Sequence, residues 1–180
     1  IYINTGLIHY GVNPGRQAIE LAEEILSTQG LEFVGLISHS PKDTDGGQQF
    51  DNESSRSHIQ MVLDTRSDFE KQGIDVASVS VGGTYNYKIA GAMEGVTSVI
   101  AGSYALMDQQ HVGCGLIFKP AAKIKSIVTS IPEVGTVITD AGQKSIGADT
   151  GMPVSEGISE SKVVSLSAEH GRLETNAEDV

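Results

Sequence analysis

The sequence contains one cysteine, few basic residues and no long apolar run. Its single cysteine, Cys114, cannot form a disulfide within the chain and excludes a metal site built from several cysteines. Twelve Lys and Arg residues against 23 Asp and Glu residues give a net charge of −11 at pH 7. Phosphate backbones and anionic lipids repel so acidic a chain, so we expect neither a nucleic-acid partner nor a membrane surface. No run reaches the roughly 18 apolar residues of a membrane helix, and no signal peptide opens the chain, which predicts a soluble, cytoplasmic protein.

The residues that are present suffice for a packed core. The chain has 180 residues, of which 39% are hydrophobic and 19% are charged, as expected for one domain or a large part of a bigger one. It opens at Ile1 without a methionine, inside a strand-like run, and stops at Val180 after an acidic tail. Since natural termini usually lie in loosely held segments, we interpret the chain as an internal piece of a longer protein.

Two segments of the first half have the periodicity of amphipathic helices. In residues 14–29 the apolar residues recur largely at three- and four-residue intervals, and Gly30 follows the last turn. In residues 54–72 the apolar side chains again fall mostly on one side, and Gly73 ends the segment. The spacing predicts two helices that each bury one face.

Short β-prone runs alternate with these helices. Residues 1–3 begin the series, and residues 31–37 (LEFVGLI) suit a strand buried on both faces. Residues 76–81 (VASVSV) and 97–100 follow, with a short helical segment around residues 87–93 between them. This rhythm predicts parallel strands joined by right-handed crossovers.

After residue 113 the pattern changes. The β-prone runs now follow one another without an amphipathic helix between them, at residues 116–118, 124–130, 134–139 and 163–166. A turn is expected at residues 140–142, where Asp140 is explained by turn chemistry as well as by a functional role. We therefore expect two domains, a parallel α/β domain at residues 1–112 and an antiparallel, β-rich one at residues 113–180.

Polar residues follow the predicted parallel strands, where α/β proteins place their sites. Residues 82–84 (Gly-Gly-Thr) suit an anion cradle, because glycines allow backbone N–H groups to approach a phosphate and the threonine adds a hydroxyl. A tight turn that binds nothing explains the same residues. His39 and His9 are each more typical of a structural histidine, and Tyr104 of a core residue with its hydroxyl at the rim. No two histidines have the i, i+4 spacing of a helical metal site.

Several blocks together resemble one known family. Residues 4–12 (NTGLIHYGV) resemble the strand end of fold-type III pyridoxal-phosphate enzymes, the group of alanine racemase, and residues 31–40 resemble the strand that follows. The remaining blocks are VSVGGT at residues 79–84, VTSVIAGSYALMD at residues 96–108, DAGQKSIGADTG at residues 140–151 and LSAEHG at residues 166–171. In this order they are similar to the D-threonine aldolase and D-serine dehydratase-like family over nearly the whole chain.

The resemblance implies a fold, a cofactor and a reaction. The fold would be α/β, part of an alanine-racemase-type (β/α)8 barrel followed by the start of a β-rich C-terminal domain. Pyridoxal 5'-phosphate would be held by Gly83 and Thr84 at its phosphate, with Tyr104 beside its ring and His39 and His9 in or near the pocket. The intact protein would be a lyase that acts on a small-molecule D-3-hydroxy amino acid with the help of a divalent metal, and a homodimer is its expected assembly.

The chain also departs from the family. Asn4 stands where the family has Asp and His9 where it has Arg, and a histidine differs from an arginine in length and in charge near neutral pH. The family's Schiff-base lysine and metal ligands lie in blocks before Ile1 and after Val180, so we expect this chain alone to be inactive. A D-serine dehydratase-type lyase and a non-catalytic cofactor-binding remnant are the alternatives.

Overall fold

The computed structural model describes residues 1–6, 11–39, 52–113, 116–149 and 151–176. The chain divides into two compact units. Ile1–Tyr104 form the first unit, and Ala105–Gly113 together with Ile117–Val180 form the second. The expected domain boundary between residues 112 and 113 of the intact protein stays a prediction.

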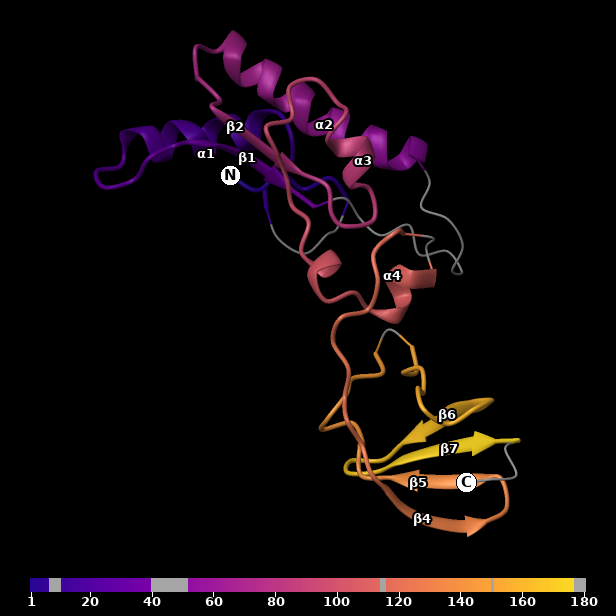
Figure 1. Ribbon diagram of the computed structural model, residues 1–180. Helices are drawn as coiled ribbons and strands as arrows, with labels where there is room; N and C mark the ends of the chain where they lie inside the picture. Colours follow the sequence, from indigo (N-terminus) through magenta and orange to yellow (C-terminus); the bar gives the residue numbers. More distant parts are fainter. Residues whose placement is uncertain (7–10, 40–51, 114–115, 150, 177–180) are drawn as a thin grey trace. The chain divides into compact units, whose positions relative to one another are not determined.

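The first unit contains a parallel sheet with helices beside it (Figure 1). Its elements are α1 (Arg16–Ser27), β1 (Gly35–Ser38), α2 (Asn52–Lys71), β2 (Ser78–Val81), α3 (Tyr87–Ala90) and β3 (Ser98–Val99). The strands pair in the order β1-β2-β3, and both pairs are parallel, which confirms the alternation predicted from the sequence. The extended N-terminal segment adds to this sheet, because Ile3 N donates to Ile37 O at 2.9 Å and Ile37 N donates to Ile1 O at 2.9 Å. The chain is thus an α/β protein.

Alternation along the strands determines which side chains enter the core. Leu36 of β1 and Val79 and Val81 of β2 are buried, and they pack in one cluster with the apolar faces of α1 and α2. The sequence placed a strand buried on both faces at residues 31–37, and this was wrong, because β1 begins only at Gly35 and Ile37 is exposed. Gly35 is required where it stands, since a Cβ there would lie 2.0 Å from Ser78 O.

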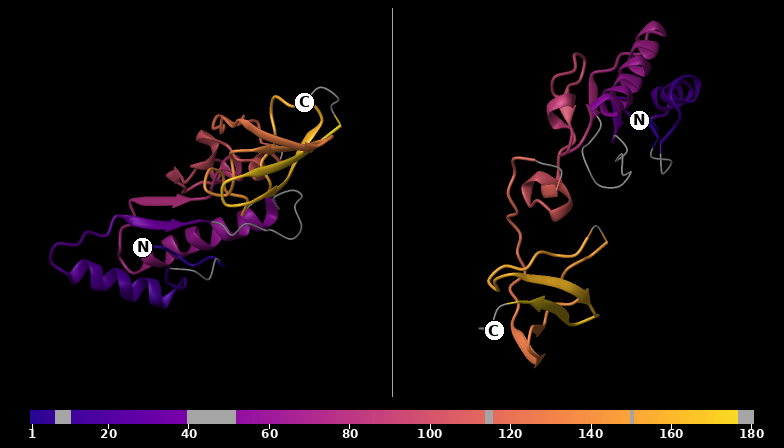
Figure 2. Two further views of the ribbon diagram at one scale, coloured as in Figure 1. Left: turned by 90° about the horizontal axis from the view of Figure 1, so that it is seen from below. Right: turned by 90° about the vertical axis from the view of Figure 1, so that its right-hand side faces the viewer.

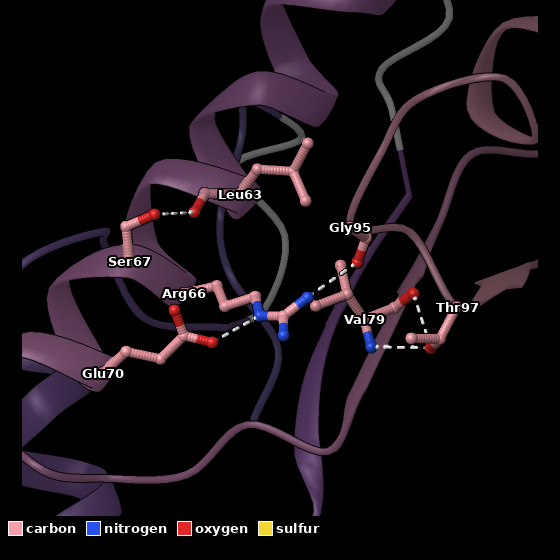
Figure 3. Close-up of polar contacts among 7 residues, drawn as sticks. All are labelled: Leu63, Arg66, Ser67, Glu70, Val79, Gly95 and Thr97. Carbon is pink, nitrogen blue, oxygen red and sulfur yellow. Dashed lines mark hydrogen bonds and ion pairs between the residues drawn. The ribbon is translucent and has the colours of Figure 1, made fainter.

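Polar side chains fix α2 and β3 against β2 (Figure 3). Arg66 of α2 forms an ion pair with Glu70 at 2.7 Å and donates from Nη1 to Gly95 O at 3.1 Å. Just before β3, Thr97 Oγ1 accepts a hydrogen bond from Val79 N at 2.9 Å and donates to Val79 O at 3.1 Å. These contacts hold the loop that leads into β3 on both sides.

The second unit contains a four-stranded antiparallel sheet, seen from two further sides in Figure 2. Its elements are α4 (Gln109–Gly113), β4 (Val128–Glu133), β5 (Thr136–Thr139), β6 (Ser161–Leu166) and β7 (Gly171–Thr175), and the short 3-10 helix η1 (Ser103–Ala105) leads into it. The strand order is β4-β5-β7-β6, so β4 lies at an edge, and all six of its residues are exposed. Val137, Val163 and Leu173 form the core of this sheet.

Two features of the second unit differ from the prediction. Residues 116–118 do not form a strand, since Pro120 follows closely and a proline has no N–H to donate to a ladder. The strand β7 was not predicted, because Leu173 is its only strongly apolar residue. Its strand conformation is stabilised by backbone pairing with β5 on one side and β6 on the other. In the described part of the chain, no helix has the length and apolarity that crossing a bilayer requires.

Candidate functional site

The ends of the parallel strands bring polar residues to one edge of the first sheet. Thr5 follows the N-terminal segment, His39 follows β1, residues 82–84 follow β2 and residues 102–104 come shortly after β3. Because parallel strands point the same way, their carboxyl ends share one edge, where ligands bind in open α/β sheets. These four strand ends form the candidate site.

A buried pair of hydroxyl groups joins the first two strand ends. Ser38 Oγ donates to Ile3 O at 2.8 Å and lies 2.9 Å from Thr5 Oγ1. Either hydroxyl can donate in the contact between Thr5 and Ser38. Both side chains are buried, so these bonds satisfy groups that water does not reach and fix the backbone just before His39.

His39 bridges the ends of two neighbouring strands. Its Nδ1 lies 3.0 Å from Gly82 O, and its backbone N–H donates to Tyr2 Oη at 2.9 Å. The imidazole therefore lies beside the glycine-rich turn that follows β2. The predicted place of His39 in or near a cofactor pocket stays a prediction.

The Gly-Gly-Thr turn is held from within by Asn86. Gly83 N donates to Asn86 Oδ1 at 2.8 Å, and Asn86 is buried. Gly82 has φ 79°, and a Cβ there would lie 2.9 Å from Ala90 Cβ, so a glycine is needed to bring α3 this close. The Gly83 amide, which was predicted to face a phosphate, thus has a partner inside the turn. Asn86 was not predicted as a site residue, although an Asn side chain that bonds to a nearby backbone group is typical of turns.

Thr84 and Tyr104 meet at this edge. Thr84 is only 3% exposed, and its Oγ1 accepts a hydrogen bond from Tyr104 N at 3.1 Å. A hydroxyl has one hydrogen of its own, and within the described ranges no acceptor for the Thr84 hydrogen is present. The Tyr104 side chain is 47% exposed, so the interpretation of Tyr104 as a core residue was wrong.

The surroundings of these groups suit an anionic ligand that also carries a hydrogen-bond donor. Thr84 has a buried hydrogen to donate, His39 has a second ring nitrogen, and a Cβ on Gly102 would meet nothing within 4 Å, so there is space beside the strand ends. A phosphate group accepts hydrogen bonds from a hydroxyl of the kind that Thr84 carries. His9 lies outside the described residues, and those residues contain no group of three or more His, Cys, Asp or Glu placed to hold a metal ion.

Asp140 accepts hydrogen bonds from the backbone and a side chain of the second unit. Its Oδ1 accepts hydrogen bonds from Ile127 N at 2.8 Å and from Ser126 Oγ at 2.9 Å. The bond from the Ile127 amide, followed by that from Ser126, lowers the pKa of the Asp140 carboxyl below its usual value. Asp140 follows directly after β5 and ties this point to the segment that leads into β4, in agreement with its interpretation as a turn residue.

Similarity to characterised proteins extends over nearly the whole chain. The chain is 26% identical over 186 residues to a D-threonine aldolase from Arthrobacter sp, an alignment that covers 99% of the chain and 49% of that protein. It is 25% identical to a 3-hydroxy-D-aspartate aldolase from Paracoccus denitrificans (strain Pd 1222), over 97% of the chain and 48% of the relative. Residues 121–180 match the family model described as "Putative serine dehydratase domain".

Solved structures of the same group of enzymes are also similar to the chain. The crystal structure of D-threonine aldolase from Filomicrobium marinum superposes with a TM-score of 0.79 at 26% identity, over 98% of the chain and 48% of that structure. The predicted resemblance to the D-threonine aldolase group of fold-type III pyridoxal-phosphate enzymes is confirmed. An alanine racemase from Clostridium difficile 630 superposes with a TM-score of 0.63 at 13% identity, over 99% of the chain and 49% of that structure, and shares the fold. The chain spans about half the length of the members of the D-threonine aldolase group that it matches.

Proposed function

We propose that this chain is part of a pyridoxal-phosphate-dependent lyase that acts on D-3-hydroxy amino acids, of the D-threonine aldolase type. The observation that carries the proposal is the 3.1 Å hydrogen bond from Tyr104 N to Thr84 Oγ1, which brings two residues of the predicted cofactor site together at the strand ends. The relatives named D-threonine aldolase and 3-hydroxy-D-aspartate aldolase support the reaction class. A cytoplasmic location and a homodimer belong to the same proposal.

In this proposal the strand ends hold the cofactor from one side. Thr84 donates its free hydrogen to the phosphate, Tyr104 lies beside the ring, and His39 lines the pocket together with His9 and Gly83. When bound, pyridoxal phosphate accepts the electron pair that is left at Cα as the Cα–Cβ bond of the substrate breaks. Burial of Thr84 keeps water from competing for its hydrogen, which strengthens the contact with an anion.

The covalent lysine and the divalent metal are assigned by the proposal to parts of the protein outside this chain. In the described part of the first unit, the residues directly after β1, β2 and β3 include no lysine. The chain alone would then bind the cofactor without forming product.

A D-serine dehydratase-type lyase is the second candidate. It is favoured by the match of residues 121–180 to the serine dehydratase family model and by a D-threo-3-hydroxyaspartate dehydratase among the similar structures, at 19% identity and a TM-score of 0.75. The products distinguish the two reactions, since aldol cleavage of D-threonine releases acetaldehyde and glycine, whereas dehydration releases ammonia and a 2-oxo acid.

Cofactor binding can be tested directly on the chain. We expect pyridoxal 5'-phosphate to bind and Thr84→Val to weaken binding about 10- to 100-fold, because a hydrogen bond to a charged group contributes about 1.5–3 kcal/mol. Thr84→Ser keeps the hydroxyl and is the matched control. Quenching of tyrosine fluorescence and the cofactor's absorbance measure the affinity. Equal affinity of Thr84→Val and the natural chain would contradict the proposed role of Thr84.

Turnover tests the assignment of the lysine. We expect no acetaldehyde from D-threonine with this chain, pyridoxal phosphate and a divalent metal, because the group that forms the covalent link is absent. The longer protein, expressed from the gene with its flanking coding sequence, should release acetaldehyde under the same conditions. Robust turnover by the 180-residue chain would show that the chain supplies its own catalytic lysine.

A further inference from the structure

One hydrogen bond determines the protonation pattern of the His39 ring. The Nδ1 atom lies 3.0 Å from the carbonyl oxygen of Gly82. A carbonyl can only accept a hydrogen bond, so Nδ1 must carry a hydrogen. In the neutral imidazole the other nitrogen, Nε2, is then without a hydrogen and holds a lone pair.

The backbone around His39 makes this arrangement stable. The His39 N–H donates to Tyr2 Oη at 2.9 Å, and the preceding Ser38 is fixed by its bond to Ile3 O at 2.8 Å. On the other side, Gly82 lies between β2 and the turn that Asn86 closes. The donor and the acceptor are thus each held by a separate strand end.

The Nε2 atom of His39 has no hydrogen-bond partner among the described residues. Throughout the described residues, every fully buried side-chain nitrogen or oxygen has a hydrogen-bond partner. Nε2 of His39 has no partner there, so it is not fully buried. The same ranges contain no ion pair that joins a carboxylate to His39. No described residue therefore uses the lone pair of Nε2.

We infer that His39 is a specificity-determining residue that accepts a hydrogen bond at Nε2 from a donor group of the bound ligand. The inference rests on the proposed function, because the ligand is the cofactor that this function requires. Thr84 and His39 have opposite roles: the hydroxyl donates to an anionic group, and the imidazole accepts from a hydroxyl, an ammonium or a protonated ring nitrogen. The site therefore favours a ligand that carries both kinds of group over a simple anion.

The protonation pattern can be measured without any ligand. In the ligand-free chain labelled with 15N-histidine, we expect the ring signals of neutral His39 to show hydrogen at Nδ1 and none at Nε2. His39→Asn identifies the signals, because it removes them and no others. A neutral ring with its hydrogen at Nε2 would overturn the inference.

Two variants separate the ring nitrogens in a binding experiment. His39→Asn places an amide at the position of Nδ1, where it can still donate to Gly82 O, and lacks a group at the position of Nε2. His39→Gln places an amide oxygen near the position of Nε2. We expect pyridoxal 5'-phosphate to bind about three- to tenfold more weakly to His39→Asn than to the natural chain, and His39→Gln to lose less. Circular dichroism verifies that both variants are folded.

Inorganic sulfate is the control ligand. Its affinity, measured by calorimetry, should be unchanged in His39→Asn and reduced in Thr84→Val, since sulfate carries no hydrogen at neutral pH and has nothing to donate to Nε2. If His39→Asn weakens both ligands equally, or binds the cofactor as well as the natural chain does, the inference is wrong while the proposed function stands. If the natural chain does not bind pyridoxal phosphate, the proposed function fails and the inference falls with it.

Discussion

The carboxylate of Asp140 connects two segments of the second unit. Its Oδ1 accepts one hydrogen bond from the Ile127 amide and one from the Ser126 hydroxyl, although the residue itself is exposed. Both bonds favour the ionised carboxylate, which is why the pKa of Asp140 is lowered. A group whose pKa is lower in the folded than in the unfolded chain stabilises the fold above its unfolded pKa, and this contribution is lost as the pH falls through the folded pKa.

We expect Asp140→Asn to destabilise the second unit at neutral pH. The amide can accept the same hydrogen bonds without a charge, so it accepts them more weakly. The difference in the free energy of unfolding between the natural chain and the variant should shrink as the pH falls below about 4, where the natural carboxylate gains its proton. Urea denaturation at several pH values measures this, and Asp149→Asn is the control, because Asp149 accepts no such bond in the described part of the chain. A difference that does not change with pH would contradict this explanation.

The strand β3 shows how a very short strand is held in place. It has two residues, and its pairing with β2 is reinforced by the side chain of the preceding Thr97, which contacts both the N–H and the carbonyl of Val79. Arg66 of α2 holds the same loop two residues earlier, through its hydrogen bond to Gly95 O. These contacts fix the segment that leads through β3 to Tyr104, so they also help to position the candidate site.

We expect Thr97→Val to lower the free energy of unfolding by about 1 kcal/mol. Valine has nearly the shape of threonine but cannot bond to Val79, and the net contribution of such a hydrogen bond is about 0.5–1.5 kcal/mol. Because Thr97 is exposed, water replaces part of the lost contact. Thr97→Ser, which keeps the hydroxyl, should stay close to the natural chain in urea denaturation. A stable Thr97→Val variant together with an unstable Thr97→Ser variant would show that the methyl group matters and the hydroxyl does not.

The helices were easier to predict than the strands for a physical reason. A three- to four-residue period and a following glycine set the bounds of α1 and α2 to within two residues. The run at residues 31–37 is apolar apart from Glu32, so periodicity could not show that pairing with β2 begins only at Gly35. The four strand ends of the site followed from the order of the elements, whereas the bond from His39 to Gly82 and the bond from Gly83 to Asn86 depend on distances that the sequence does not contain.

The whole molecule has two apolar cores of unequal size. Among the described residues, the core of the first unit contains 12 buried hydrophobic residues, and that of the second contains three. Burial of apolar surface is the main source of folding free energy. The sheet of the second unit therefore depends more on backbone hydrogen bonds and on polar ties such as that of Asp140.

We expect the two units to differ in local stability. Amides of β5 and β7 in the second unit should exchange with deuterium faster than those of β1 and β2 in the first unit, because fewer buried side chains oppose local opening. Hydrogen exchange measured by mass spectrometry resolves these segments. Phe69→Ala, which removes the largest fully buried side chain, should accelerate exchange in the first unit. Equal protection of both sheets would show that core size does not set their stability.

The exposed edge strand β4 has a consequence for handling the protein. An edge presents a row of unpaired backbone groups onto which a second chain can add a strand, and Val128 and Ile131 would give such an addition apolar contacts. Pro132 interrupts the row, because it offers no hydrogen to an incoming backbone. We therefore expect Pro132 to oppose the addition of a second chain at this edge.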